Sequence, residues 1–143
     1  MWIVYALLAS VVWGLDYVLA EKIFQSRISP QTLLALQMLV GAIIFLSLAY
    51  FTTLRGDALI LASDNRACWL TVAALIGFAV ANLLIAMSIK AKNAALAGLI
   101  EISYPIFIAF FSWLLFRDNH VTPGIALGGG LIFAGVFVIY CSA

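Results

Sequence analysis

Long apolar stretches separated by short polar segments dominate the hydrophobic pattern of the chain. Five apolar runs occur, approximately at residues 2–20, 32–52, 67–88, 93–116 and 121–140. Each matches the roughly 20 helical residues that cross about 30 Å of hydrocarbon. The polar segments between them, EKIFQSRISP, TLRGDALILASDNR, IKAK and RDNH, are too short to hold a second domain. The pattern therefore predicts an all-α membrane protein of one domain, residues 1–143, with five antiparallel transmembrane helices.

Composition supports the same class. Hydrophobic residues make up 66% of the chain and charged residues only 9%, against about 45–50% and about 25% in soluble domains. We therefore expect the lipid bilayer as a partner and a multi-pass location in a cell inner membrane. The net charge of +1 gives no information about partners, and we expect no nucleic-acid ligand. The first run has no basic leader, so we expect a retained helix and not a cleaved signal peptide.

Few residues indicate enzymatic or cofactor chemistry. Cys68 opens the third run and Cys141 closes the fifth, so they fall on opposite faces of the membrane. This argues against a disulfide between them, and neither has a metal-ligand spacing. The single histidine, His120, lies with Asp118 in a polar connection that we interpret as a solvated turn. No nucleophile arrangement and no phosphate-binding glycine loop is present. We expect no enzyme activity, no metal and no cofactor.

Lysines and arginines near the helix ends are divided almost evenly between the two membrane faces. One face receives Arg55, Arg66 and Arg117, and the other receives Lys22, Arg27, Lys90 and Lys92. Because orientation follows from an excess of such residues on one side, this balance allows insertion in both orientations. The alternatives are that the small excess decides, or that a partner protein or the insertion machinery does.

The stretch GLIEISYPIFI, residues 98–108, sets an acid and a helix breaker four residues apart. Glu101 lies about eight residues into the fourth run, roughly 12 Å along a helix and close to the bilayer midplane. Pro105 cannot donate to the carbonyl group of Glu101, so we predict a kink there and a polar pocket beside the carboxyl group. Asp16 lies nearer a helix end, where water reaches it more easily.

A carboxylate at membrane depth is costly and usually marks a function. Because burial disfavours the charged form, we expect Glu101 to rest protonated and to exchange its proton for a cationic or polar solute. The alternative is that a neutral Glu101 only bonds to a neighbouring helix while Pro105 shapes the packing.

Helical spacing predicts two faces for the fourth helix. The inward face is formed by small or polar residues, namely Ala94, Ala97, Gly98, Glu101, Tyr104, Pro105, Ile108 and Ser112. The lipid face is formed by Leu99, Ile102, Ile106, Phe110 and Trp113.

Other helices offer candidates for the same cavity. Trp13 and Asp16 share a face of the first helix with Tyr5, Gln37 lies in the second helix, and Asn82 lies in the third. The two amides are equally compatible with cavity lining and with interhelical hydrogen bonding. Tyr5, Trp13 and Tyr104 could stack on a ligand, although membrane aromatics more often pack or anchor at the interface.

The fifth run has the composition of a packing helix. Thr122 and Pro123 suit its start. Small residues recur at intervals of four, at Gly124 and Gly128 and at Ala126, Gly130 and Ala134. This spacing lets helix backbones approach closely, in the same chain or in another.

The chain resembles the EamA-type domains of the drug/metabolite transporter superfamily over essentially its whole length. Residues 13–42 (WGLDYVLAEKIFQSRISPQTLLALQMLVGA) resemble the start of such a domain. Residues 93–116 and 124–139 resemble its end. Gln37, where many members have arginine, and the segment RDNH are departures.

The resemblance implies one half of a ten-helix transporter built from inverted repeats around a central cavity. It also implies a secondary transporter of a metabolite, amino acid or drug-like compound, working as a homodimer or with another half-transporter. The distantly related small multidrug resistance proteins are antiparallel dimers with a carboxylate on their first helix, of which Asp16 is the nearer analogue. The alternative function is a non-transporting scaffold or accessory subunit.

Overall fold

The computed structural model describes residues 1–117 and 122–142. No strand occurs among them, and the helices are α1 (Trp2–Gln25), α2 (Pro30–Thr52), α3 (Leu54–Ser63), α4 (Asn65–Ala91), α5 (Ala94–Glu101), α6 (Tyr104–Phe111), the π-helix η1 (Ser112–Phe116) and α7 (Pro123–Ser142). Five spans have the length and composition to cross a membrane, the fourth being α5, α6 and η1 together. The prediction of an all-α membrane protein with five such helices is confirmed. Asp118 and His120 lie outside the described residues.

Local capping explains where several helices begin. The hydroxyl group of Ser29 accepts a hydrogen bond from the backbone N–H of Thr32 at 3.2 Å, directly before Pro30 at the start of α2. The carboxylate of Asp64 accepts from the N–H of Arg66 at 2.9 Å and starts α4 in the same way. These bonds satisfy N–H groups that have no partner within the helix. Thr122 begins α7 as the sequence predicts, because its hydroxyl group accepts from the N–H of Ile125 at 3.3 Å.

Two segments are more helical than the apolar pattern indicates. The structure continues α1 to Gln25, past the end expected at residue 20, since charged residues can extend a helix beyond the hydrocarbon. The connection after the second run contains the helix α3, which we interpreted only as a polar link. A transmembrane pattern measures the length of the apolar run, and it does not report helical structure outside that run.

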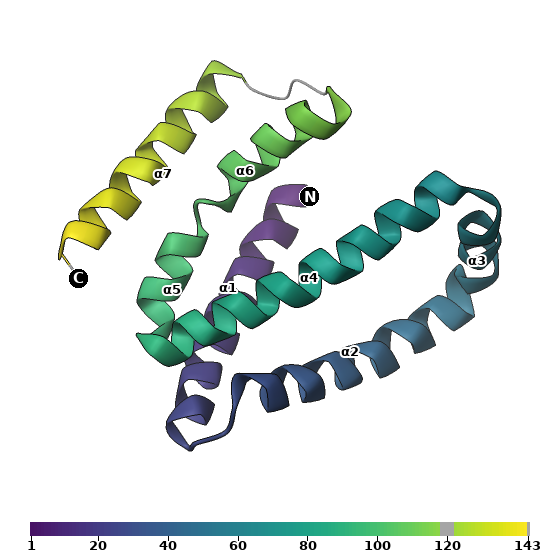
Figure 1. Ribbon diagram of the computed structural model, residues 1–143, viewed down its shortest axis with the longest axis horizontal. Helices are drawn as coiled ribbons and strands as arrows, with labels where there is room; N and C mark the ends of the chain where they lie inside the picture. Colours follow the sequence, from purple (N-terminus) through teal and green to yellow (C-terminus); the bar gives the residue numbers. More distant parts are fainter. Residues whose placement is uncertain (118–121, 143) are drawn as a thin grey trace.

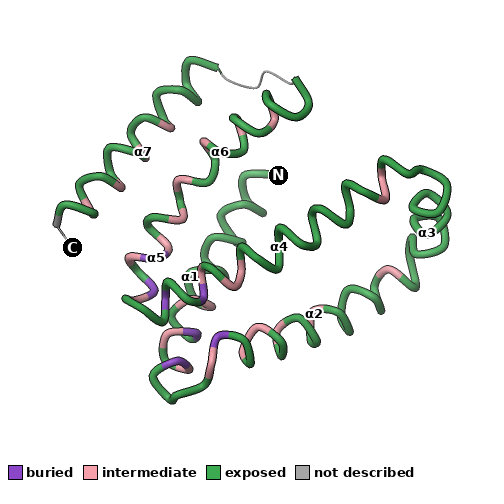
Figure 2. Tube along the Cα trace, in the orientation of Figure 1, coloured by how far each residue is buried: buried purple, intermediate pink, exposed green. Residues whose placement is uncertain are grey.

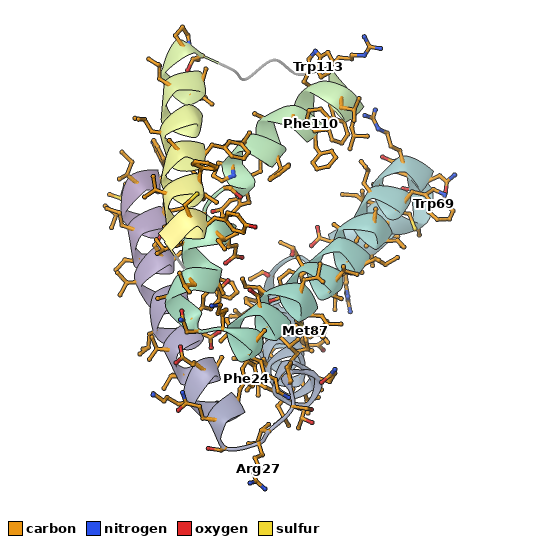
Figure 3. All side chains as sticks on the ribbon, turned by 60° about the vertical axis from the view of Figure 1, so that its left-hand side comes forward. Phe24, Arg27, Trp69, Met87, Phe110 and Trp113 are labelled. Carbon is orange, nitrogen blue, oxygen red and sulfur yellow. The ribbon has the colours of Figure 1, made fainter. Side chains whose placement is uncertain are left out.

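The helices form two arms that meet at one end of the molecule (Figure 1). One arm contains α2 and α4, which run side by side toward α3, and the other contains α5, α6 and α7. Helix α1 lies at the junction and contacts both α4 and α5. In the side-chain view, Phe24 and Met87 lie near this junction with Arg27 at its tip, whereas Trp69 and Trp113 lie toward the far ends of the two arms (Figure 3).

Buried residues gather where the arms meet (Figure 2). The buried core consists of Ala20, Phe24, Ala86, Ile89, Ala94 and Ala97. Four of these six residues are alanine, and such small side chains let membrane helices approach closely. Most other apolar side chains are exposed, which suits helices that contact lipid.

Candidate functional site

Two consecutive residues of α1 connect to two different helices. The amide Nε2 of Gln37 on α2 donates to Oδ1 of Asp16 at 3.0 Å. The hydroxyl group of Tyr17 donates to Oε2 of Glu101, the last residue of α5. All four side chains are half-buried. The structure therefore gathers Asp16, Gln37 and Glu101 around α1, one helical turn from the core residue Ala20.

The fourth span is interrupted directly after Glu101. Helix α5 ends at this residue, and α6 begins at Tyr104 with Pro105 in its first turn. Across the break, the N–H of Ser103 donates to the carbonyl group of Ile100 at 3.2 Å, and the N–H of Ile106 donates to that of Ser103 at 3.2 Å. These are bonds to the third preceding residue, which tighten a helix turn. The interruption predicted from Pro105 is present, and it places the carboxyl group of Glu101 at a helix end.

Glycine and tryptophan shape the position of the Tyr17 ring. A Cβ atom added at Gly98 would lie 3.5 Å from Cδ2 of Tyr17, so the ring packs on the backbone of α5. Trp13 also meets Tyr17 edge to face, with ring centroids 5.8 Å apart and an interplanar angle of 69°. Such edge contacts between aromatic rings are favourable. Trp13 thus joins the site through Tyr17.

The opposite end of α5 is attached to α1 as well. Oε2 of Glu21 accepts a hydrogen bond from the backbone N–H of Ala94 at 2.7 Å. Directly before α5, the side chain of Asn93 caps the helix by accepting a hydrogen bond from the N–H of Leu96 at 2.8 Å. Because Tyr17 and Glu21 are four residues apart, they lie on one face of α1. This face therefore holds the short helix α5 at both its first residue and its last.

The predicted inward face of the fourth helix holds in α5 and is lost in α6. Ala94 and Ala97 are buried. Beyond the break, Tyr104 is 56% exposed. Ile106, which we assigned to the lipid face, instead approaches α7: a Cβ atom added at Gly129 would lie 3.2 Å from Cγ1 of Ile106. The expectation of one continuous stripe is therefore wrong, because a helix broken at residues 102 and 103 does not keep its angular register.

Asn82 lies apart from these contacts. Its amide Nδ2 donates to the backbone carbonyl group of Phe78 at 2.8 Å, within α4. Its side-chain hydrogen bond therefore stays on its own helix, unlike that of Gln37.

Small residues of α7 border a pocket of about 530 Å³ between α6 and α7. Its apolar lining includes Pro105, Ile106, Gly128 and Gly130. A Cβ atom at Gly128 or Gly130 would meet nothing within 4 Å. Gly124 and Ala134 are exposed as well, so the close approach of α7 within this chain is made by Gly129.

The carboxyl groups of the site are matched with neutral donors. Asp16 meets an amide and Glu101 meets a phenol, and in the described part of the chain no lysine or arginine pairs with either. The cationic residues of the sequence lie at helix ends or in connections. Neutral donors orient a carboxylate without cancelling its charge.

Sequence reasoning missed Tyr17 and Glu21. Their spacing of four residues on the face that also carries Trp13 was an available signal. However, Tyr17 looked like an ordinary membrane aromatic, and Glu21 fell in a segment that we interpreted as a polar connection. Only the packing of α1 against α5 distinguishes them from such residues.

Comparison with known proteins identifies the family. The model of the EamA-like transporter family matches residues 1–141. The chain belongs to this family. It is also 31% identical over 123 residues to YicL, an uncharacterized inner membrane transporter of Salmonella typhimurium strain LT2. The match covers 83% of this chain and 39% of YicL, so the EamA-like chain spans less than half the length of this relative. No solved structure shows a significant match.

Proposed function

We propose that this EamA-like chain is a subunit of a secondary transporter that moves a small solute across the inner membrane by alternating access. The solute is a metabolite, an amino acid or a drug-like compound, and its movement is coupled to protons through Glu101, which releases its proton when the solute binds. The observation that carries this proposal is a carboxyl group at a helix break inside a membrane span, held by a neutral phenol. Broken helices with polar groups at mid-membrane are typical of transporter binding sites.

The proposed assembly pairs this five-helix unit with a second one. Alternating access through inverted repeats requires two opposed units around a central site. The match to 39% of YicL is compatible with one unit of a larger transporter. The balanced distribution of lysines and arginines favours a second copy in the opposite orientation as the other unit, with a separate half-transporter as the alternative partner.

The test is solute-driven proton movement in reconstituted vesicles. Vesicles that contain a pH-sensitive dye are exposed in turn to amino acids, sugar derivatives and cationic drugs such as tetraphenylphosphonium. For the class that drives proton movement, Glu101→Gln is expected to reduce the signal to that of empty vesicles, because the amide cannot exchange a proton. Asp57→Asn removes an exposed carboxylate on α3 and is expected to leave the signal unchanged.

The same experiment separates transport from a purely structural role. If the Glu101→Gln protein is folded and its proton flux equals that of the unaltered protein, Glu101 carries no proton and the coupling is rejected. If no solute class moves protons or is itself taken up, the chain is better described as a scaffold or an accessory subunit.

A further inference from the structure

We propose that Tyr17 is the positioning residue of Glu101: its hydroxyl group fixes the carboxyl group at the helix break, and a proton or solute reaches Glu101 in competition with this phenol. The inference deepens the proposed function and rests on it for its consequence in transport. The contact itself can be tested without any solute.

The direction of the hydrogen bond supports this role. The phenol is the donor and Oε2 of Glu101 is the acceptor, so the bond stabilises the ionised carboxylate relative to the protonated acid. Hydrogen bonds to charged groups are roughly twice as strong as bonds between neutral groups. A proton or solute that binds Oε2 of Glu101 therefore has to compete with the phenol of Tyr17 for the same oxygen.

The ring of Tyr17 has two packing neighbours. Gly98 lies one turn before Glu101 on α5, and its missing side chain leaves room for the ring at 3.5 Å from the Cβ position. Trp13 packs on the ring with centroids 5.8 Å apart. A donor whose own orientation is fixed by packing aligns its acceptor more tightly than a mobile one.

The helix that carries Glu101 is itself attached to α1. Glu21 holds the N–H of Ala94 at 2.7 Å, so α5 is attached to α1 at the end opposite Glu101. The bond from Tyr17 thus joins two elements that are already aligned. Substitution of Tyr17 by phenylalanine keeps the ring contacts and removes only the donor.

Infrared difference spectroscopy between acidic and alkaline samples tests the contact. The carbonyl stretching band of protonated Glu101 is assigned by its absence in Glu101→Gln. In Tyr17→Phe, this band is expected at higher wavenumber, because the carbonyl oxygen loses its donor. Tyr5→Phe removes an exposed hydroxyl group of the same helix and is expected to leave the band in place. An unchanged band in folded Tyr17→Phe protein would overturn the inference.

Labelling with dicyclohexylcarbodiimide, which reacts with protonated carboxyl groups in membranes, provides a second measurement. Mass spectrometry follows the label at Glu101. Asp16 in the same digest is the reference, because its hydrogen-bond donor is the amide of Gln37 and not the phenol of Tyr17. At a pH where most of Glu101 is ionised, removing the phenol is expected to raise the rate at Glu101 by roughly ten- to hundredfold, the range that corresponds to one hydrogen bond to a charged group. Equal rates with and without the phenol would contradict the role of Tyr17.

Proton flux in vesicles distinguishes this inference from the proposed function. If Tyr17 acts through Glu101, Tyr17→Phe alone is expected to alter the solute-driven proton flux, whereas in the Glu101→Gln background it leaves the signal at the level of empty vesicles. Unchanged flux in folded Tyr17→Phe protein would show that the phenol takes no part in the coupling. Flux that survives Glu101→Gln rejects the coupling, while the band shift still reports whether Tyr17 holds the carboxyl group.

Discussion

At the scale of single residues, the site depends on which side chains are absent as much as on which are present. Tyr17 reaches Glu101 because Gly98 presents bare backbone to its ring. The neighbouring residue Asp16 points to Gln37 on another helix. Adjacent positions on a helix face different directions, so one turn of α1 serves two partners.

Enlarging Gly98 is expected to displace the phenol from Glu101. The added Cβ of alanine lies at ordinary contact distance from the ring, 3.5 Å, so we expect Gly98→Ala to be tolerated. Gly98→Leu overfills the contact, with an expected loss of about 1–3 kcal/mol in the free energy of unfolding. It is also expected to move the Glu101 infrared band as Tyr17→Phe does.

Gly77 provides the matched control, because a Cβ atom there meets nothing within 4 Å on α4. Gly77→Leu is expected to change neither the stability measured by chemical unfolding nor the infrared band. A Gly98→Leu protein with an unmoved band would show that the ring does not depend on the space at Gly98.

At the scale of elements, the fourth span consists of two helical segments with separate attachments. Helix α5 is held by α1 through Tyr17 and Glu21. Helix α6 approaches α7, where Ile106 meets Gly129. Helix α5 contacts α7 as well, but in the described residues only α5 is hydrogen-bonded to α1. The break at residues 102 and 103 therefore separates a segment bonded to α1 from one without such bonds, and we expect the span to bend there.

Replacing Pro105 by alanine is expected to favour a continuous helix. Alanine supplies the N–H group that proline lacks, and proline inside a helix costs about 3 kcal/mol or more. We expect slower hydrogen–deuterium exchange of the amides at residues 102–106 and reduced solute-driven proton flux. Pro30→Ala is the control, because the backbone is extended at Ser29 directly before Pro30, so no preceding helix can continue through it. Unchanged exchange in Pro105→Ala would mean that tertiary contacts, and not the proline, keep the span broken.

At the scale of the whole molecule, the two arms share one small core and diverge from it (Figures 1 and 2). The site lies next to this core. Asp16 and Tyr17 are four and three residues from the buried Ala20, and Glu101 is four residues from the buried Ala97. The exposed apolar faces of the arms suit lipid or a second five-helix unit. Such a unit in the opposite orientation would complete an inverted repeat around the acids.

Cysteine labelling in intact cells tests for the opposite orientation. Ala91→Cys at the exposed end of α4 leaves the number of cationic residues unchanged, and Cys68 and Cys141 are first replaced by serine. We expect Ala91→Cys to react with a membrane-impermeant maleimide from both sides, because the balanced charges allow both insertions. Ser63→Cys marks the opposite membrane face and is expected to react from both sides too. Labelling of each site from a single side would exclude an antiparallel homodimer.

The sequence alone determined the class of the protein, the five spans and the break at Pro105. Each of these depends on local quantities: the length of an apolar run, the missing N–H of a proline and the cost of an acid such as Glu101 in hydrocarbon. These quantities do not change with the arrangement of the helices, so they can be evaluated along the chain.

Only the tertiary structure decided which groups meet. It joined Tyr17 to Glu101 and Gln37 to Asp16, left Asn82 bonded to its own helix, and turned Ile106 toward Gly129. In a membrane helix, apolar residues surround the whole circumference, so hydrophobic periodicity does not show which face packs against a neighbour. The rotation of each helix about its own axis follows from close contacts between small residues, and those contacts exist only once the helices are assembled.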